Sequence, residues 1–124
     1  MMAKMYPELY VSDVERMASF FEEALGFRVT DQFEDDGVID FAVLKSGEIM
    51  LYLHNMLPVE ESSQSRHTRL FFEPDDIFGL HARLRDKGFT VSDLEDQDYG
   101  AGARSCKLAA PDSYEIVLHQ FNTN

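Results

Sequence analysis

The chain has 124 residues, 44% of them hydrophobic and 27% charged, which fits a single globular domain over residues 1–124 and excludes a disordered or collagen-like chain. Its formal net charge of -12 would repel a phosphate backbone and favours cationic ligands, so we expect no nucleic acid and no anionic membrane surface as partners. Residues 1–10 lack the pattern of a signal peptide, no apolar run could span a bilayer, and the single Cys106 cannot form an internal disulfide. We therefore expect a soluble, cytoplasmic protein.

The first half of the chain shows one helix pattern among several strand patterns. Residues 7–11 (PELYV) are typical of a short strand, and residues 12–15 (SDVE) have the form of a capping box that opens a helix. Gly26 is placed to end this helix in the left-handed conformation. Turn residues at 34–37 and 46–47 then separate three further predicted strands, at 27–33, 38–44 and 48–54.

The second half repeats the same order of elements. A strand at 66–72 precedes a helix that begins at 74–76 (PDD) and ends at Gly88, and strands at 89–94, 104–108 and 114–120 complete the unit. The segment LGFRV at 25–29 matches KGFTV at 87–91, and LYLHN at 51–55 matches IVLHQ at 116–120. The sequence thus predicts two βαβββ modules, at 6–54 and 66–120, joined by a polar linker at 55–65. Residues 95–103 are interpreted as an irregular loop, either a flap over a ligand or a plain surface loop.

Two motifs carry a resemblance to a known family. The segment FFEEALGF at 20–27 and the segment APDSYEI at 110–116 are similar to the patterns F-Y-x-x-x-L-G-F and D-P-D-G-x-x-I-E-L, although Ala110 and Ser113 replace Asp and Gly. With the duplication, the chain resembles the vicinal oxygen chelate superfamily from about Tyr6 to Gln120; this superfamily includes glyoxalase I, bleomycin-resistance proteins and extradiol dioxygenases. The resemblance implies an α+β fold in which two βαβββ modules form a curled mixed sheet, a half-barrel, with helices on the convex face and the ligand on the concave face. It also implies a homodimer.

Strand alternation indicates which side chains would face that ligand. Side chains two residues apart share a face of a strand. The apolar residues expected to pack against the helices are Leu9, Val11, Ile49, Leu51, Leu53, Leu70, Phe72, Ile116 and Leu118. Arg104 would reach a ligand or face solvent. The complete set of predicted ligand-binding residues is Tyr6, Glu8, Tyr10, Tyr52, His54, His67, Arg69, Phe71, Arg104, Glu115 and His119.

The metal ligands of the family fall on four positions of this chain. The resemblance places them at Tyr6, Tyr52, His67 and Val117, of which only His67 is an ordinary ligand. Since a catalytic metal needs about three protein ligands, we expect neither a metal nor another cofactor. A shifted set that uses Glu8, His67, Glu115 and His119 to hold Zn or Ni is the alternative.

Three functions remain open on this basis. The leading hypothesis is a protein that binds a small, partly aromatic molecule without metal and sequesters a drug or metabolite, as bleomycin-resistance relatives do. The second is a metal-dependent lyase, isomerase or dioxygenase of the same superfamily with an altered site. An enzyme without metal would instead rely on general acid–base catalysis by a pair such as His67 and Glu8. The third is a metabolite-sensing or accessory module.

Overall fold

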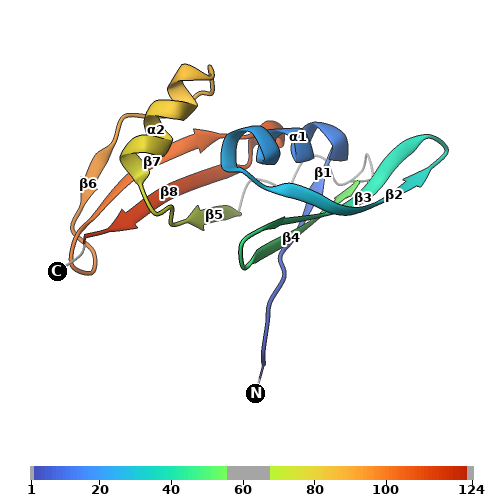
Figure 1. Ribbon diagram of the computed structural model, residues 1–124, viewed down its shortest axis with the longest axis horizontal. Helices are drawn as coiled ribbons and strands as arrows, with labels where there is room; N and C mark the ends of the chain where they lie inside the picture. The colour runs from blue at the N-terminus through green and yellow to red at the C-terminus, as the bar shows by residue number, and fades with distance from the viewer. Residues whose placement is uncertain (1, 56–67, 123–124) are drawn as a thin grey trace. The chain divides into compact units, whose positions relative to one another are not determined.

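The computed structural model describes residues 2–55 and 68–122 of the chain (Figure 1). The chain divides into two compact units, Met1–Gln64 and Ser65–Asn124, and the described part of each unit contains one α-helix and one four-stranded mixed sheet. The predicted βαβββ order is therefore confirmed in both halves. The elements are β1 (Glu8–Val11), α1 (Val14–Leu25), β2 (Arg28–Asp35), β3 (Val38–Ser46) and β4 (Ile49–Asn55), then β5 (Arg69–Phe72), α2 (Ile77–Asp86), β6 (Glu95–Gln97), β7 (Ala103–Ala109), a 3₁₀ turn (Pro111–Ser113) and β8 (Glu115–Phe121).

The two sheets have the same topology. Their strand orders are β1-β4-β3-β2 and β5-β8-β7-β6, so the first and last strands of each unit are neighbours. These neighbours run parallel, while all other pairs are antiparallel. The parallel register pairs Glu8 with Tyr52 in the first sheet and Arg69 with Glu115 in the second. Side chains that are far apart in the sequence are thereby brought together on one face of each sheet.

An aspartate side chain opens each helix. The Asp13 carboxylate accepts a hydrogen bond from the backbone N–H of Arg16 at 3.0 Å, and Asp76 accepts one from the N–H of Gly79 at 3.1 Å. The cap of α1 is therefore Asp13 and not Ser12, which the capping-box prediction favoured. Gly26 ends α1 with φ of 73°, as predicted, since a left-handed residue costs glycine little.

The core of each unit lies between its helix and one face of its sheet. The apolar residues predicted for this face are buried at less than 5% exposure on β1, on β8 and at two positions of β4. Ile49 differs from the prediction, because it is the first residue of β4 and is 44% exposed. Leu70 and Phe72 on β5 are half-buried and are less enclosed than predicted. The buried side chains on the helix side are Leu9, Val11, Val14, Met17, Phe21, Leu51 and Leu53 in the first unit, and Ile77, Leu80, Leu84, Ile116 and Leu118 in the second.

The sixth strand does not lie where the sequence predicted it. Within the predicted strand 89–94 only Val91 forms an isolated bridge, to Leu108, whereas β6 pairs with β7 at 95–97, inside the predicted irregular loop. Contacts with α2 explain the shift, because His81 Nε2 lies 2.9 Å from the carbonyl of Ser92 and Arg85 forms an ion pair with Asp93. These contacts hold residues 92–93 beside α2, so that regular pairing with β7 begins only at Glu95.

Two further predictions concern the linker and the possibility of a membrane-spanning segment. Residues 56–65 of the predicted linker lie outside the described residues, and Asn55 is the last residue of β4. Of the helices in the described ranges, none is both long and apolar enough to cross a membrane.

Candidate functional site

The first sheet presents four predicted site residues on the face opposite to α1. Glu8 and Tyr10 on β1 lie beside Tyr52 and His54 on β4, because the parallel register aligns the two pairs. The rings of Tyr10 and His54 stack with centroids 5.4 Å apart. Tyr6 lies just before β1, and its ring packs 5.7 Å from that of Tyr52.

Phe41 extends this aromatic surface and was not among the predicted site residues. Its ring centroid lies 5.5 Å from that of Tyr52 and 5.8 Å from that of His54. The ring of Phe33 on β2 lies 5.9 Å from that of Phe41. Residue 41 lies on a strand that the sequence did predict, opposite His54 in the antiparallel register. That register is the signal that would have found Phe41, and it depends on the turn between β3 and β4.

Two carboxylates flank His54. Its Nδ1 lies 3.8 Å from the Glu8 carboxylate, and its Nε2 lies 4.0 Å from the Asp40 carboxylate. Both distances exceed that of a hydrogen bond, and both contacts become ion pairs only when the imidazole is protonated. The first sheet therefore combines aromatic rings with acidic groups.

The second sheet brings together four other predicted residues. Arg69 and Phe71 on β5 lie beside Glu115 and His119 on β8, again on the face opposite to the helix. The guanidinium carbon of Arg69 is 5.3 Å from the centre of the Phe71 ring, a cation–π distance. Phe71 in turn packs edge-on against His119 at 5.3 Å.

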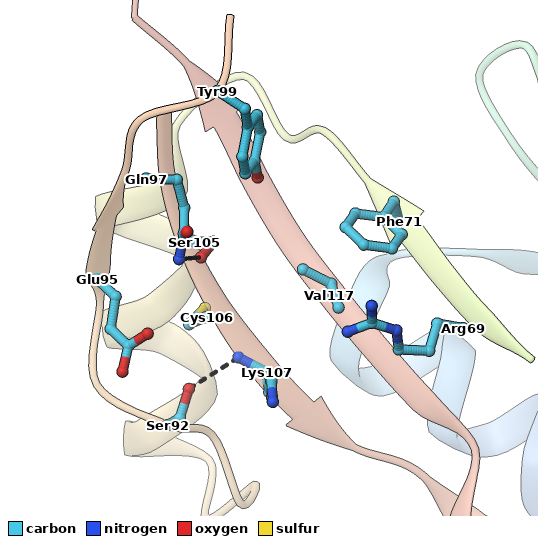
Figure 2. Close-up of a pocket in the computed structure, with 10 residues that line it drawn as sticks. All are labelled: Arg69, Phe71, Ser92, Glu95, Gln97, Tyr99, Ser105, Cys106, Lys107 and Val117. Carbon is cyan, nitrogen blue, oxygen red and sulfur yellow. Dashed lines mark hydrogen bonds between the residues drawn. The ribbon is translucent and has the colours of Figure 1, made fainter. Parts of the chain in front are cut away.

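A cavity of about 380 Å³ opens on this face of the second sheet (Figure 2). Tyr99, in the loop between β6 and β7, borders it with Gln97 and Ser105, whose side chains share a hydrogen bond of 2.9 Å. The Tyr99 hydroxyl lies 3.3 Å from His119 Nδ1, within hydrogen-bonding distance. The predicted loop thus contributes a ring to the site, although Tyr99 itself was not predicted.

Two cations and one carboxylate meet at one end of this cavity. Arg69 Nη1 lies 3.8 Å and Lys107 Nζ lies 3.5 Å from the same oxygen of Glu115. Lys107 was not predicted, because its position beside Val117 depends on the antiparallel register between β7 and β8. Figure 2 shows the Arg69 and Lys107 side chains on opposite sides of Val117, and all three residues line the cavity.

Two predicted residues remain, of which Arg104 is described and does not join these groups. Arg104 lies on the α2 side of β7, where its Nε is 2.9 Å from an Asp96 oxygen and its guanidinium is 5.3 Å from the Phe78 ring. The structure thus separates Arg104 from the cavity-facing residues of its own sheet. His67 lies outside the described residues.

Cys106 borders the cavity but is a poor nucleophile. Its side chain is buried, and this loss of solvation raises the pKa of the thiol above its ordinary value of 9.0, although Arg85 partly opposes the effect. The thiol is therefore protonated at neutral pH, and the reactive thiolate is scarce. Burial as an apolar side chain accounts for this residue.

Comparison with known proteins identifies the family. The sequence profile described as Glyoxalase/Bleomycin resistance protein/Dioxygenase superfamily matches residues 5–118. The chain therefore belongs to this superfamily. A comparison with curated protein sequences finds no match.

Solved structures share the fold over nearly the whole chain. The antibiotic-binding protein TnmS3 from Streptomyces sp. CB03234 is 22% identical, with 98% of each chain covered and a TM-score of 0.77. A bleomycin-binding protein complexed with bleomycin is 20% identical, with 98% of this chain and 100% of that chain covered and a TM-score of 0.73. A glyoxalase-related enzyme from Clostridium phytofermentans is 19% identical, with 98% and 97% covered and a TM-score of 0.77. These similarities confirm the α+β class with two βαβββ modules, and they include both binding proteins and an enzyme.

Of the positions that the family resemblance assigns to metal ligands, those of Tyr52 and Val117 do not fit a metal ion. Val117 is 5% exposed and has no donor atom, and Tyr52 packs against the rings of Tyr6 and Phe41. In the ranges 2–55 and 68–122, no cluster of three or more His, Cys, Asp or Glu side chains is arranged to hold a metal. In the alternative set, Glu115 contacts two cations and His119 contacts Tyr99, and four residues along a strand separate them by roughly 13 Å.

Proposed function

We propose that this protein binds a small, partly aromatic molecule without metal and sequesters it. One observation carries the proposal, and it concerns the face of each sheet that does not pack against the helix. On this face, aromatic rings lie at or beside the positions that the family resemblance assigns to metal ligands. Tyr52 lies among rings in the first unit, and Val117 lies beside Phe71 in the second. Such a surface offers stacking and not Lewis-acid chemistry.

The chemistry of these faces supports an aromatic ligand. Several rings remain partly exposed, including Tyr6 at 39%, Phe71 at 51% and Tyr99 at 41%. A bound ring would remove this apolar surface from water, and each aromatic contact adds about 0.5–1.5 kcal/mol beyond the buried area. The neighbouring His119, Gln97 and Ser105 provide the few polar groups that orient a ligand in such a pocket.

A neutral fluorescent probe tests aromatic binding. N-phenyl-1-naphthylamine is expected to bind with saturable fluorescence enhancement, and Phe71→Ala or Tyr52→Ala is expected to weaken its affinity about threefold to tenfold, in line with a loss of about 1 kcal/mol. The control is Phe78→Ala, because Phe78 has a similar exposure of 55% but lies on α2. Equal effects of the Phe71 and Phe78 changes, or no saturable binding, would contradict the proposal.

Antibiotics are the first natural compounds to test, because two similar structures are described as antibiotic-binding and bleomycin-binding proteins. Sequestration predicts that overexpression raises the drug concentration that cells tolerate. It also predicts that the purified protein binds the drug at a fixed stoichiometry and releases it chemically unchanged.

Metal analysis separates this proposal from the enzyme alternative. Protein purified without chelator and then incubated with Ni, Zn, Mn or Fe is expected to retain no stoichiometric metal after gel filtration. Retention of one ion per chain, together with turnover of a glyoxalase or dioxygenase substrate, would establish the second hypothesis instead.

A further inference from the structure

We propose that the cavity of the second unit receives the anionic group of an aromatic ligand between Arg69 and Lys107. This inference rests on the proposed function and gives its ligand a chemical class: an aromatic ring that carries a carboxylate, sulfonate or phosphate. The net charge of -12 would lead one to expect a cationic ligand, so the inference concerns local charge and not the charge of the whole chain.

The two cations retain most of their binding capacity. Both contact the same oxygen of Glu115, at 3.8 Å and 3.5 Å, which are longer than the 2.7–2.9 Å typical of a charge-assisted hydrogen bond. A guanidinium has five N–H donors and an ammonium has three, and one carboxylate oxygen cannot satisfy them. Two positive charges against one negative charge leave this end of the cavity attractive to a second anion.

Their exposure makes the cations accessible to such a group. The side chain of Arg69 is 50% exposed and that of Lys107 is 65% exposed, whereas Val117 between their strands is buried. Lys107 and Val117 are direct partners across β7 and β8, and Phe71 is the partner of Val117 on the other side. An anion held here would rest on an apolar floor at the centre of the sheet.

Aromatic rings continue from this cationic end along β8. Arg69 lies over Phe71, Phe71 contacts His119, and Tyr99 approaches His119 through its hydroxyl. Since Glu115 and His119 are four residues apart on one strand, the two ends are separated by roughly 13 Å. A ligand with an acidic group at one end and a fused or substituted ring at the other fits this arrangement.

Glu95 is the carboxylate among the residues that line the cavity. It lies on β6 opposite Ser105 and, among the described residues, forms no ion pair with Arg69 or Lys107. It would oppose an anion weakly from the far side of β7. The balance of charge therefore predicts opposite effects of removing a cation and removing a carboxylate.

Two probes that differ by a single group make the test. 1-Anilinonaphthalene-8-sulfonate carries the rings of N-phenyl-1-naphthylamine and adds an anionic sulfonate. The wild-type protein is expected to bind the sulfonate more tightly than the neutral probe, in fluorescence titrations of the full chain. Arg69→Gln and Lys107→Gln are each expected to weaken sulfonate binding about threefold to tenfold, as is typical of partly exposed charges, and to change the affinity for the neutral probe much less.

Three further variants provide controls. Arg104→Gln removes a cation with a comparable side-chain exposure of 45% from the opposite face of the same sheet, so it should leave both affinities unchanged. Arg69→Lys keeps the charge and should keep most of the sulfonate affinity, which guards against a folding defect in Arg69→Gln. Glu115→Gln frees both cations and should strengthen sulfonate binding about threefold or more, a gain that a purely structural ion pair would not produce.

The outcomes separate this inference from the proposed function. If the neutral probe binds at Phe71 but the sulfonate has no advantage, or if Arg69→Gln and Lys107→Gln bind the sulfonate like wild type, the anionic site is refuted and the aromatic site stands. If neither probe binds, both are refuted. If Glu115→Gln weakens sulfonate binding while the fold is intact by circular dichroism, the carboxylate belongs to the ligand site and the inference is wrong.

Discussion

At the scale of single residues, Ser113 adopts a backbone conformation that suits glycine. Its φ is 60°, and the preceding Asp112 has φ of 59°, so two successive residues lie in the left-handed region. A non-glycine residue there costs roughly 1–2 kcal/mol. The family pattern has glycine at this position, so this chain retains the turn while losing the residue that forms it most easily.

Ser113→Gly is therefore expected to stabilise the protein. The relief of backbone strain exceeds the larger entropy that glycine gains in the unfolded chain, which leaves a net gain of up to about 1 kcal/mol in the free energy of unfolding. Urea denaturation followed by circular dichroism measures it. The same substitution at Ser19, an exposed position of α1, is the control and should destabilise by roughly 0.5 kcal/mol. A loss of stability in Ser113→Gly would show that the serine side chain contributes more than its backbone costs.

At the scale of elements, each helix depends on one capping carboxylate. Asp76→Ala removes the acceptor for the N–H of Gly79 and is expected to lower the free energy of unfolding by about 0.5–2 kcal/mol. The neighbouring Asp75→Ala is the matched control, because the Asp75 contact with Gln120 uses the Asp75 backbone carbonyl and not its side chain. Comparable losses in both variants would mean that charge near the helix start matters more than the cap itself.

Local patterns in the sequence predicted most elements, since periodicity and turn residues are local properties. The end of α1 at Gly26 and the packing faces of β1, β4 and β8 follow directly from these local patterns. The position of β6 could not be predicted this way, because it depends on the contacts of His81 and Arg85 with the segment before it. The sequence separates these partners by up to eleven residues and gives no sign of the pairing.

The predicted site shows the same division. Strand alternation placed Tyr52, His54 and Phe71 together with their neighbours on one face of each sheet. Lys107 and Phe41 were missed because their membership depends on the register between antiparallel strands, which the turns set. Tyr99 depends on the path of a loop. Whether these residues bind a ligand stays a prediction that the probe experiments test.

At the scale of the whole molecule, the family resemblance predicts a homodimer. Analytical ultracentrifugation at micromolar concentration is expected to give twice the 14.2 kDa mass of one chain. Because like-charged chains of -12 repel each other, dilution at low salt should favour the monomer relative to dilution at physiological salt. A mass of one chain under both conditions would contradict the prediction.

The alternation of side chains along each strand divides the sequence into two sets that evolve under different demands. One set, which includes Leu53 and Leu118, holds the helix and is constrained by packing. The other set points away from the core, and its members can be exchanged without disturbing what lies behind the sheet. A duplicated module of this kind inherits its fold twice but is free to diverge in chemistry: here one copy carries acids around a histidine, and the other carries two cations around an acid. New specificity can thus arise by substitution of the outward-facing residues, which are every second residue of a strand. This is consistent with a fold that the three solved structures share at 22% identity or less.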